Sequence, residues 1–122
     1  MNKANVLSDK SYSFALKVVK LCLIIQKNQK EYVLTRQLLR SATSVGANAE
    51  EAIGGYSDND FIYKLSISYK EARETKYWIR LLKDAEIFNE KIGNELLEDV
   101  EEILKILGAS IRTMRSRIGN NS

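Results

Sequence analysis

The side chains with the clearest chemical potential in this sequence are lysines and arginines near its two ends. Residues 1–46 carry eight Lys and Arg residues against two acids, and residues 103–122 carry four against none. Cationic side chains grouped on one surface can hold the phosphates of RNA or DNA. The candidate residues for nucleic-acid binding are Lys10, Lys17, Lys20, Arg112, Arg115 and Arg117.

A simpler explanation of the same residues stays open. The lysines fall on the side of a predicted helix opposite its apolar stripe, where such side chains commonly contact only solvent. The arginines end a helix that is acidic at its start, which the helix dipole favours. The acids concentrate between the two basic ends, because residues 47–102 carry fourteen acids against seven cations. Nucleic-acid binding and solubilisation therefore remain alternatives.

The absence of histidine removes several kinds of catalytic chemistry, although a metal site made of carboxylates would still be possible if its ligands were grouped on facing helices. The chain has no histidine and a single cysteine, Cys22, so Ser-His and Cys-His nucleophile pairs cannot form. Histidine-containing zinc sites and Glu-x-x-His di-metal bundles are excluded for the same reason. We therefore expect no enzymatic activity, no cofactor and no metal site.

The elements that position these residues are long helices, because the chain has no proline and only six glycines. Apolar residues at three- and four-residue steps predict helices from about residue 9 to 29, 34 to 53, 58 to 85 and 90 to 118. Gly54-Gly55 predicts a left-handed end of the second helix. The expected fold is all-α, an antiparallel up-down four-helix bundle over residues 9–118, with a flexible leader at 1–8 and a flexible tail at 119–122.

The second helix should occupy the centre of this bundle. Small side chains dominate residues 41–52, so neighbouring backbones can approach it closely. Polar residues interrupt the small ones, and each needs a partner if it is buried. For Arg40 the expected partners are acids on neighbouring turns or helices.

The last two predicted helices have more apolar residues than one antiparallel bundle must bury, and the fourth shows this most clearly. Leu97, Val100, Leu104 and Leu107 follow strict heptad spacing, and a second flank is made of Leu96, Ile103 and Ile106. This excess predicts a homo-oligomer. Tyr77 and Trp78 on the third helix suggest a different function, a protein–protein adaptor without a nucleic-acid role.

The chain is expected to be cytoplasmic and to have no membrane partner. Its N-terminus is polar and lacks a signal-peptide pattern. The longest apolar run, residues 21–25, is far too short to cross a bilayer. Cys22 lies within that run, where a free thiol most simply serves as a small apolar core residue in a reducing compartment.

One long stretch resembles the S23 family, also called the 23S rRNA intervening-sequence proteins. The stretch is RSATSVGANAEEAIGGYSDNDFIYKLSISYKEARETKYWIRLLKDAEIF, and the resemblance extends from about Phe14 to Ile111. Its most specific positions are Arg40-Ser41, Ser44, Asn48, Glu51, Phe61, Ala72 and Glu74. One departure is Ala52, at a position often taken by glycine.

The resemblance implies a homopentamer around a central channel. Some relatives are encoded inside intervening sequences of bacterial 23S rRNA genes, and a similar pentameric bundle serves diversity-generating retroelements, where it engages nucleic acid and a reverse transcriptase. The family has no agreed activity and no defined catalytic residues. Apart from other copies of the chain, the partner that we expect is RNA or DNA. We interpret four motif residues as a structural polar cluster that fixes the register of the helices: Arg40, Asn48, Glu51 and Glu74.

Overall fold

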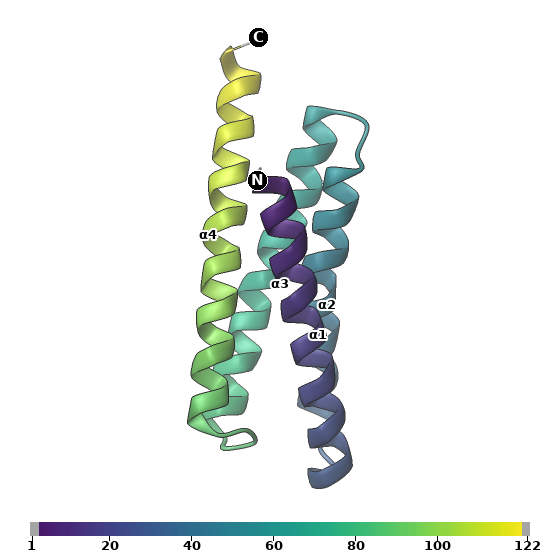
Figure 1. The fold of residues 1–122 in the computed structure, drawn as a ribbon, viewed down its shortest axis with the longest axis vertical. Helices are drawn as coiled ribbons and strands as arrows, with labels where there is room; N and C mark the ends of the chain where they lie inside the picture. The colour runs from purple at the N-terminus through teal and green to yellow at the C-terminus, as the bar shows by residue number, and fades with distance from the viewer. Residues whose placement is uncertain (1–2, 121–122) are drawn as a thin grey trace.

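The computed structural model describes residues 3–120, which form four α-helices joined by short connections. The helices are α1 (Lys3–Gln29), α2 (Val33–Ile53), α3 (Asp58–Asp84) and α4 (Glu90–Asn120). Consecutive helices run in opposite directions along one long axis, and the last turns of α4 project past the other helices (Figure 1). The predicted all-α, up-down four-helix bundle is thus confirmed. None of the four helices combines the length and apolarity needed to cross a membrane.

Each helix packs against two neighbours, so the four form a ring around one core. α2 packs on α1 and α3, and α4 packs on α3 and more sparingly on α1. α2 has a fully buried stripe that includes Leu38, Ala42, Val45 and Ala49. The small residues of that stripe let α1 and α3 approach closely, as its sequence predicts.

Hydroxyl groups rather than charges occupy the buried polar positions between α2 and α3. The hydroxyls of Ser41 and Thr75 are hydrogen bonded at 2.9 Å, and Ser68 Oγ donates to the carbonyl oxygen of Val45 at 2.7 Å. All three hydroxyl-bearing residues are completely buried. Because a buried polar group without a partner is costly, these bonds favour one register between the two helices.

The chain ends are more helical than the sequence predicts. The expected flexible leader covers residues 1–8, but residues 3–8 form the first turns of α1, because Leu7 extends its apolar stripe and is only 2% exposed. Of the expected flexible tail, residues 119 and 120 continue α4. Residues 1–2 and 121–122 lie outside the described part of the chain.

The left-handed backbone positions are not the glycines. Lys30 ends α1 at φ 57° and Glu86 follows α3 at φ 62°, whereas no glycine of the described residues has a positive φ. The predicted left-handed end at Gly54-Gly55 is therefore wrong. Gly55 serves instead for a close approach, since a Cβ there would meet the Asp60 carboxylate and would lie 3.2 Å from the carbonyl oxygen of Ala52.

The core face of α4 differs from the predicted heptad stripe. Leu96 and Ile103, assigned by the sequence to a second flank, are fully buried, whereas Leu97 and Leu104 are only partly buried. α4 contacts both α3 and α1, so the centre of its broad apolar face points between these two neighbours. Leu104 is consequently left at the margin of the core, on the side of α3.

Candidate nucleic-acid interface

The predicted basic residues of α1 are matched by acids on α4. Lys10 Nζ lies 2.7 Å from Glu102 Oε1, and Lys17 Nζ lies 2.7 Å from Asp99 Oδ2. These surface pairs neutralise both lysines, although each contributes at most about 1 kcal/mol to stability. Lys20 is exposed on α1 and has no ion pair within residues 3–120.

The predicted arginines of α4 do not join those lysines. Arg112 lies ten residues beyond Glu102, about 15 Å further along the helix axis. Arg112 and Arg115 instead line a hollow of about 310 Å³ beside Tyr69 and Lys70 of α3. Arg117 is exposed near the end of α4. The structure therefore places the arginines of α4 further along the helix than the ion pairs of Lys10 and Lys17, and brings two of them beside α3 instead.

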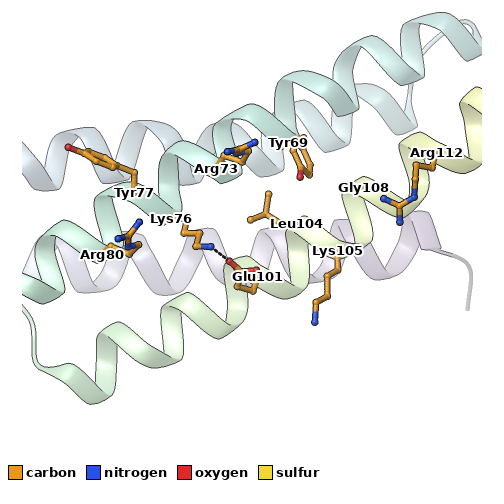
Figure 2. Close-up of a pocket in the computed structure, with 10 residues that line it drawn as sticks. All are labelled: Tyr69, Arg73, Lys76, Tyr77, Arg80, Glu101, Leu104, Lys105, Gly108 and Arg112. Atoms are coloured by element: carbon orange, nitrogen blue, oxygen red, sulfur yellow. Dashed lines mark ion pairs between the residues drawn. The ribbon is translucent and has the colours of Figure 1, made fainter.

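A larger hollow of about 620 Å³ adjoins this one and lies between α3 and α4 (Figure 2). We call it the basic groove. Its lining residues from α3 are Tyr69, Arg73, Lys76, Tyr77 and Arg80. Those from α4 are Glu101, Leu104, Lys105, Gly108 and Arg112.

The helical repeat explains why these residues meet. Arg73, Lys76 and Arg80 follow one another at steps of three and four, which places them on one face of α3. Lys105 and Arg112 are seven residues apart and share one face of α4. Apart from Arg112, the cations of the basic groove are absent from the sequence-based candidates. The spacing in α3 is the signal that would have identified three of them.

The basic groove has a large excess of positive charge. It holds five cationic side chains and one carboxylate, Glu101. Lys76 reaches across from α3, with its Nζ 2.5 Å from Glu101 Oε1 (Figure 2). The other four cations, Arg73, Arg80, Lys105 and Arg112, form no ion pair with an acid among residues 3–120. Unpaired like charges held near each other repel, and an anion bound between them would relieve that repulsion.

Aromatic rings and a glycine shape the two ends of the basic groove. The Tyr77 side chain is 55% exposed, and its ring meets Trp78 edge-on at 5.0 Å between centroids. At the other end Gly108 leaves space beside Tyr69, because a Cβ at position 108 would lie 3.8 Å from Tyr69 Cε2. Lys105 points outward from α4, away from α3 (Figure 2). The groove thus combines two aromatic residues with arginines that alternate with them: Arg73 lies between the two tyrosines along α3, and Arg80 and Arg112 lie beyond them.

The structural polar cluster predicted from Arg40, Asn48, Glu51 and Glu74 is divided in the structure. Arg40 forms ion pairs with Glu71, at 3.3 Å, and with Glu74, so it bridges α2 to α3 as expected. The same Glu74 carboxylate accepts a hydrogen bond of 2.9 Å from Trp78 Nε1. The Arg40–Glu74 ion pair therefore helps to hold Trp78 in contact with the exposed ring of Tyr77.

The other two members of the predicted cluster lie apart from Arg40. Asn48 donates to the carbonyl oxygen of Ser44 at 2.9 Å, within α2 itself. Glu51 lies 3.0 Å from Lys64 Nζ, and the hydrogen bond and charge of Glu51 raise the pKa of Lys64. A single cluster cannot form because these residues point to different neighbours along α2. The buried register contacts are the hydroxyl groups of Ser41, Ser68 and Thr75 instead.

The chain's only thiol is unsuited to chemistry. Cys22 is fully buried, and burial, reinforced by the charge of Glu31, raises its pKa to about 12. Since the thiolate is the reactive form, Cys22 is inert near neutral pH. Across residues 3–120, no three Cys, Asp or Glu side chains are grouped closely enough to hold a metal ion.

Comparisons with known proteins place this architecture in a family. The model of the 23S rRNA-intervening sequence protein family matches residues 3–109. A crystal structure of a protein of unknown function from the S23 ribosomal protein family of Bacteroides thetaiotaomicron is 43% identical, covering 91% of this chain and 99% of that one, with a TM-score of 0.89. The search of curated proteins returned no match. The chain therefore belongs to the 23S rRNA-intervening sequence protein family.

Proposed function

We propose that this protein is a non-enzymatic, homo-oligomeric helical scaffold that binds the phosphate backbone of RNA or DNA through the basic groove. The observation that carries the proposal is the group of three unpaired arginines, Arg73, Arg80 and Arg112, along the α3–α4 hollow. Phosphate contacts by Lys and Arg give affinity without base recognition, so binding would be insensitive to sequence and sensitive to salt.

The basic groove supports this function better than the predicted lysines of α1 do. Lys10 and Lys17 already have carboxylate partners, and a phosphate would have to compete with Glu102 and Asp99 for them. The unpaired cations of the groove face only one acid, Glu101. The family's name, which refers to intervening sequences of 23S rRNA, is consistent with a nucleic-acid partner but assigns none to this chain.

The exposed apolar face of α1 supports the oligomeric part of the proposal. Tyr12, Leu16 and Leu23 lie on one side of this helix, and their side chains are 69%, 42% and 57% exposed. Such a stripe on a surface helix is typical of an interface. We propose that it contacts a second copy of the chain within a homopentamer, and that the assembly resides in the cytoplasm, where Cys22 stays reduced. A closed ring would repeat the basic groove in every subunit and increase its avidity for a long polymer.

Fluorescence anisotropy with labelled RNA and DNA, titrated across salt concentration, tests the nucleic-acid part. We expect tight binding at low salt and a charge-reversal variant of the groove, Arg73→Glu/Arg112→Glu, to lose most of it. The matched control is Lys20→Glu/Lys27→Glu, which changes the charge by the same amount on exposed positions of α1. Removing two phosphate contacts should reduce the slope of log K against log salt by about 1 for each residue.

Two outcomes would contradict the proposal. Equal losses for the groove variant and the α1 variant would mean that only net charge matters. No binding to either polymer at about 50 mM salt would leave the cations of the groove as solubilising residues. The protein–protein adaptor would then be the better hypothesis.

A further inference from the structure

Two tyrosine rings share the basic groove with its cations, and phosphate binding alone does not account for them. Tyr69 and Tyr77 both line the groove and come from the same helix, eight residues or about 12 Å apart along its axis. Arg73 lies four residues from each of them. Aromatic rings that alternate with cations along a groove are typical of surfaces that bind unpaired nucleotides.

The ring of Tyr77 is held in place while much of it stays exposed. Its edge-on partner, Trp78, is held in place because it packs against the core and donates its Nε1 hydrogen to Glu74. Glu74 is in turn held by its ion pair with Arg40. A positioned and exposed ring loses little conformational entropy when a flat partner stacks on it.

The ring of Tyr69 is accessible because residue 108 has no side chain. Tyr69 is partly buried against the core, and the helix facing it carries Gly108 at the point of approach. An alanine methyl group there would make only ordinary van der Waals contact, at 3.8 Å from the Tyr69 ring and 3.5 Å from Arg112 Nη1. A longer side chain would occupy the space next to the ring.

We propose that the basic groove is a site for single-stranded nucleic acid, with bases stacked on Tyr69 and Tyr77 and phosphates held by the arginines that alternate with these rings along the groove. This inference rests on the proposed function and assigns it a class of polymer. In a duplex the bases stack on one another and are hidden from both rings, so a duplex contacts only the cations. Stacking tolerates any base, which agrees with a groove that lacks a pattern of polar groups for base recognition.

The test compares a single strand of about 16 nucleotides with a duplex containing the same number of phosphates, by anisotropy at matched salt. We expect the single strand to bind more tightly. Tyr77→Leu should weaken binding of the single strand about tenfold and leave that of the duplex unchanged, whereas Tyr77→Phe should keep the wild-type affinity for both. The Leu variant preserves apolar bulk, so its loss reports on the aromatic face.

The glycine gives an independent test at the other ring. Gly108→Leu should weaken single-strand binding by filling the space beside Tyr69, and Gly108→Ala should not. Thermal unfolding of each variant checks that the bundle stays folded.

The outcomes separate this inference from the proposed function. If single strand and duplex bind equally, and Tyr77→Leu has no effect while Arg73→Glu/Arg112→Glu does, the groove binds phosphates but the stacking proposal is wrong. If Tyr77→Leu weakens both polymers equally, stacking on an unpaired base is also refuted. If neither polymer binds the wild-type protein, the proposed function fails first and the inference fails with it.

Discussion

At the scale of single residues, the carboxylate side chains of this protein cap a helix and form ion pairs between helices, besides keeping the surface soluble. Glu31 precedes α2 and accepts hydrogen bonds from the backbone N–H groups of Leu34 at 2.8 Å and Thr35 at 2.9 Å. Those N–H groups have no acceptor within the helix, so Glu31 serves as an N-terminal cap. Partial burial raises the pKa of Glu31, but these hydrogen bonds to the carboxylate outweigh it and lower the pKa.

Glu31→Gln should destabilise the bundle at neutral pH by about 1 kcal/mol, as other cap removals do. A carboxylate whose pKa is lowered by folding stabilises the protein above its unfolded pKa of about 4.5, and this stabilisation is lost as pH falls through the folded pKa. The difference between wild type and variant should therefore shrink in acid. Chemical denaturation at pH 7 and at pH 3 to 4 measures it.

Glu98→Gln is the matched control, because Glu98 is exposed in the middle of α4 and has no ion pair within residues 3–120. A Glu98→Gln loss as large as that of Glu31→Gln would show that net charge, rather than the cap, is responsible. A Glu31→Gln difference that stays constant between pH 7 and pH 3 would contradict the pKa shift.

At the scale of elements, α2 is the helix on which the others depend. It packs on both α1 and α3, and its buried face is made mostly of small residues. Close approach there allows the hydroxyl contacts with α3, including the one from Ser68 to the backbone of Val45. Helices that approach so closely leave no room for a larger side chain.

Val45→Phe should accordingly destabilise the bundle by about 1–3 kcal/mol through overpacking. Val45 is completely buried and its carbonyl oxygen accepts a hydrogen bond from Ser68 of α3, so an added ring would push the two helices apart. Thermal or denaturant unfolding measures the loss. Ala47→Phe is the control, because Ala47 is exposed on the same helix. Equal stability of Val45→Phe and wild type would contradict the central position of α2.

At the scale of the whole molecule, one side of the bundle is basic and another is apolar. The basic groove lies between α3 and α4, whereas the exposed residues Tyr12, Leu16 and Leu23 lie on α1. α1 and α3 are not in contact within the described residues. An assembly through α1 leaves the basic groove open to a ligand as long as α1 packs on a surface of the neighbouring subunit other than its α3–α4 face.

Light scattering should show one species of about 70 kDa, against 13.9 kDa for a single chain, if the proposed homopentamer forms. Leu16→Glu/Leu23→Glu should reduce the mass towards that of a monomer, because charged side chains are costly in an apolar interface. Thr113→Glu/Ser116→Glu adds the same charge at exposed positions near the end of α4 and should not. A wild-type protein of monomeric mass would contradict the proposal.

The sequence by itself determined the fold class, because helix periodicity is a local property that each segment carries independently. The buried stripe of α3 runs from Leu65 to Leu82 at three- and four-residue steps, as helix periodicity predicts, and the small residues of α2 correctly indicate a crowded helix. Local sequence patterns predict the ends of the helices less well than their middles. Leu7 became part of the core only because other helices cover it, and Lys30 and Glu86 hold left-handed positions that glycine patterns do not reveal.

Only the tertiary structure decided which cationic side chains form ion pairs and which do not. The lysines of α1 and the arginines of α4 look equivalent in the sequence, but Lys10 and Lys17 face the acids of α4 whereas Arg112 faces α3. Ion pairing depends on the axial offset between helices that are far apart in sequence, and periodicity does not specify that offset. The same offset places Arg73 and Arg80 of α3 along one hollow with Gly108 and Arg112 of α4, and so creates the basic groove.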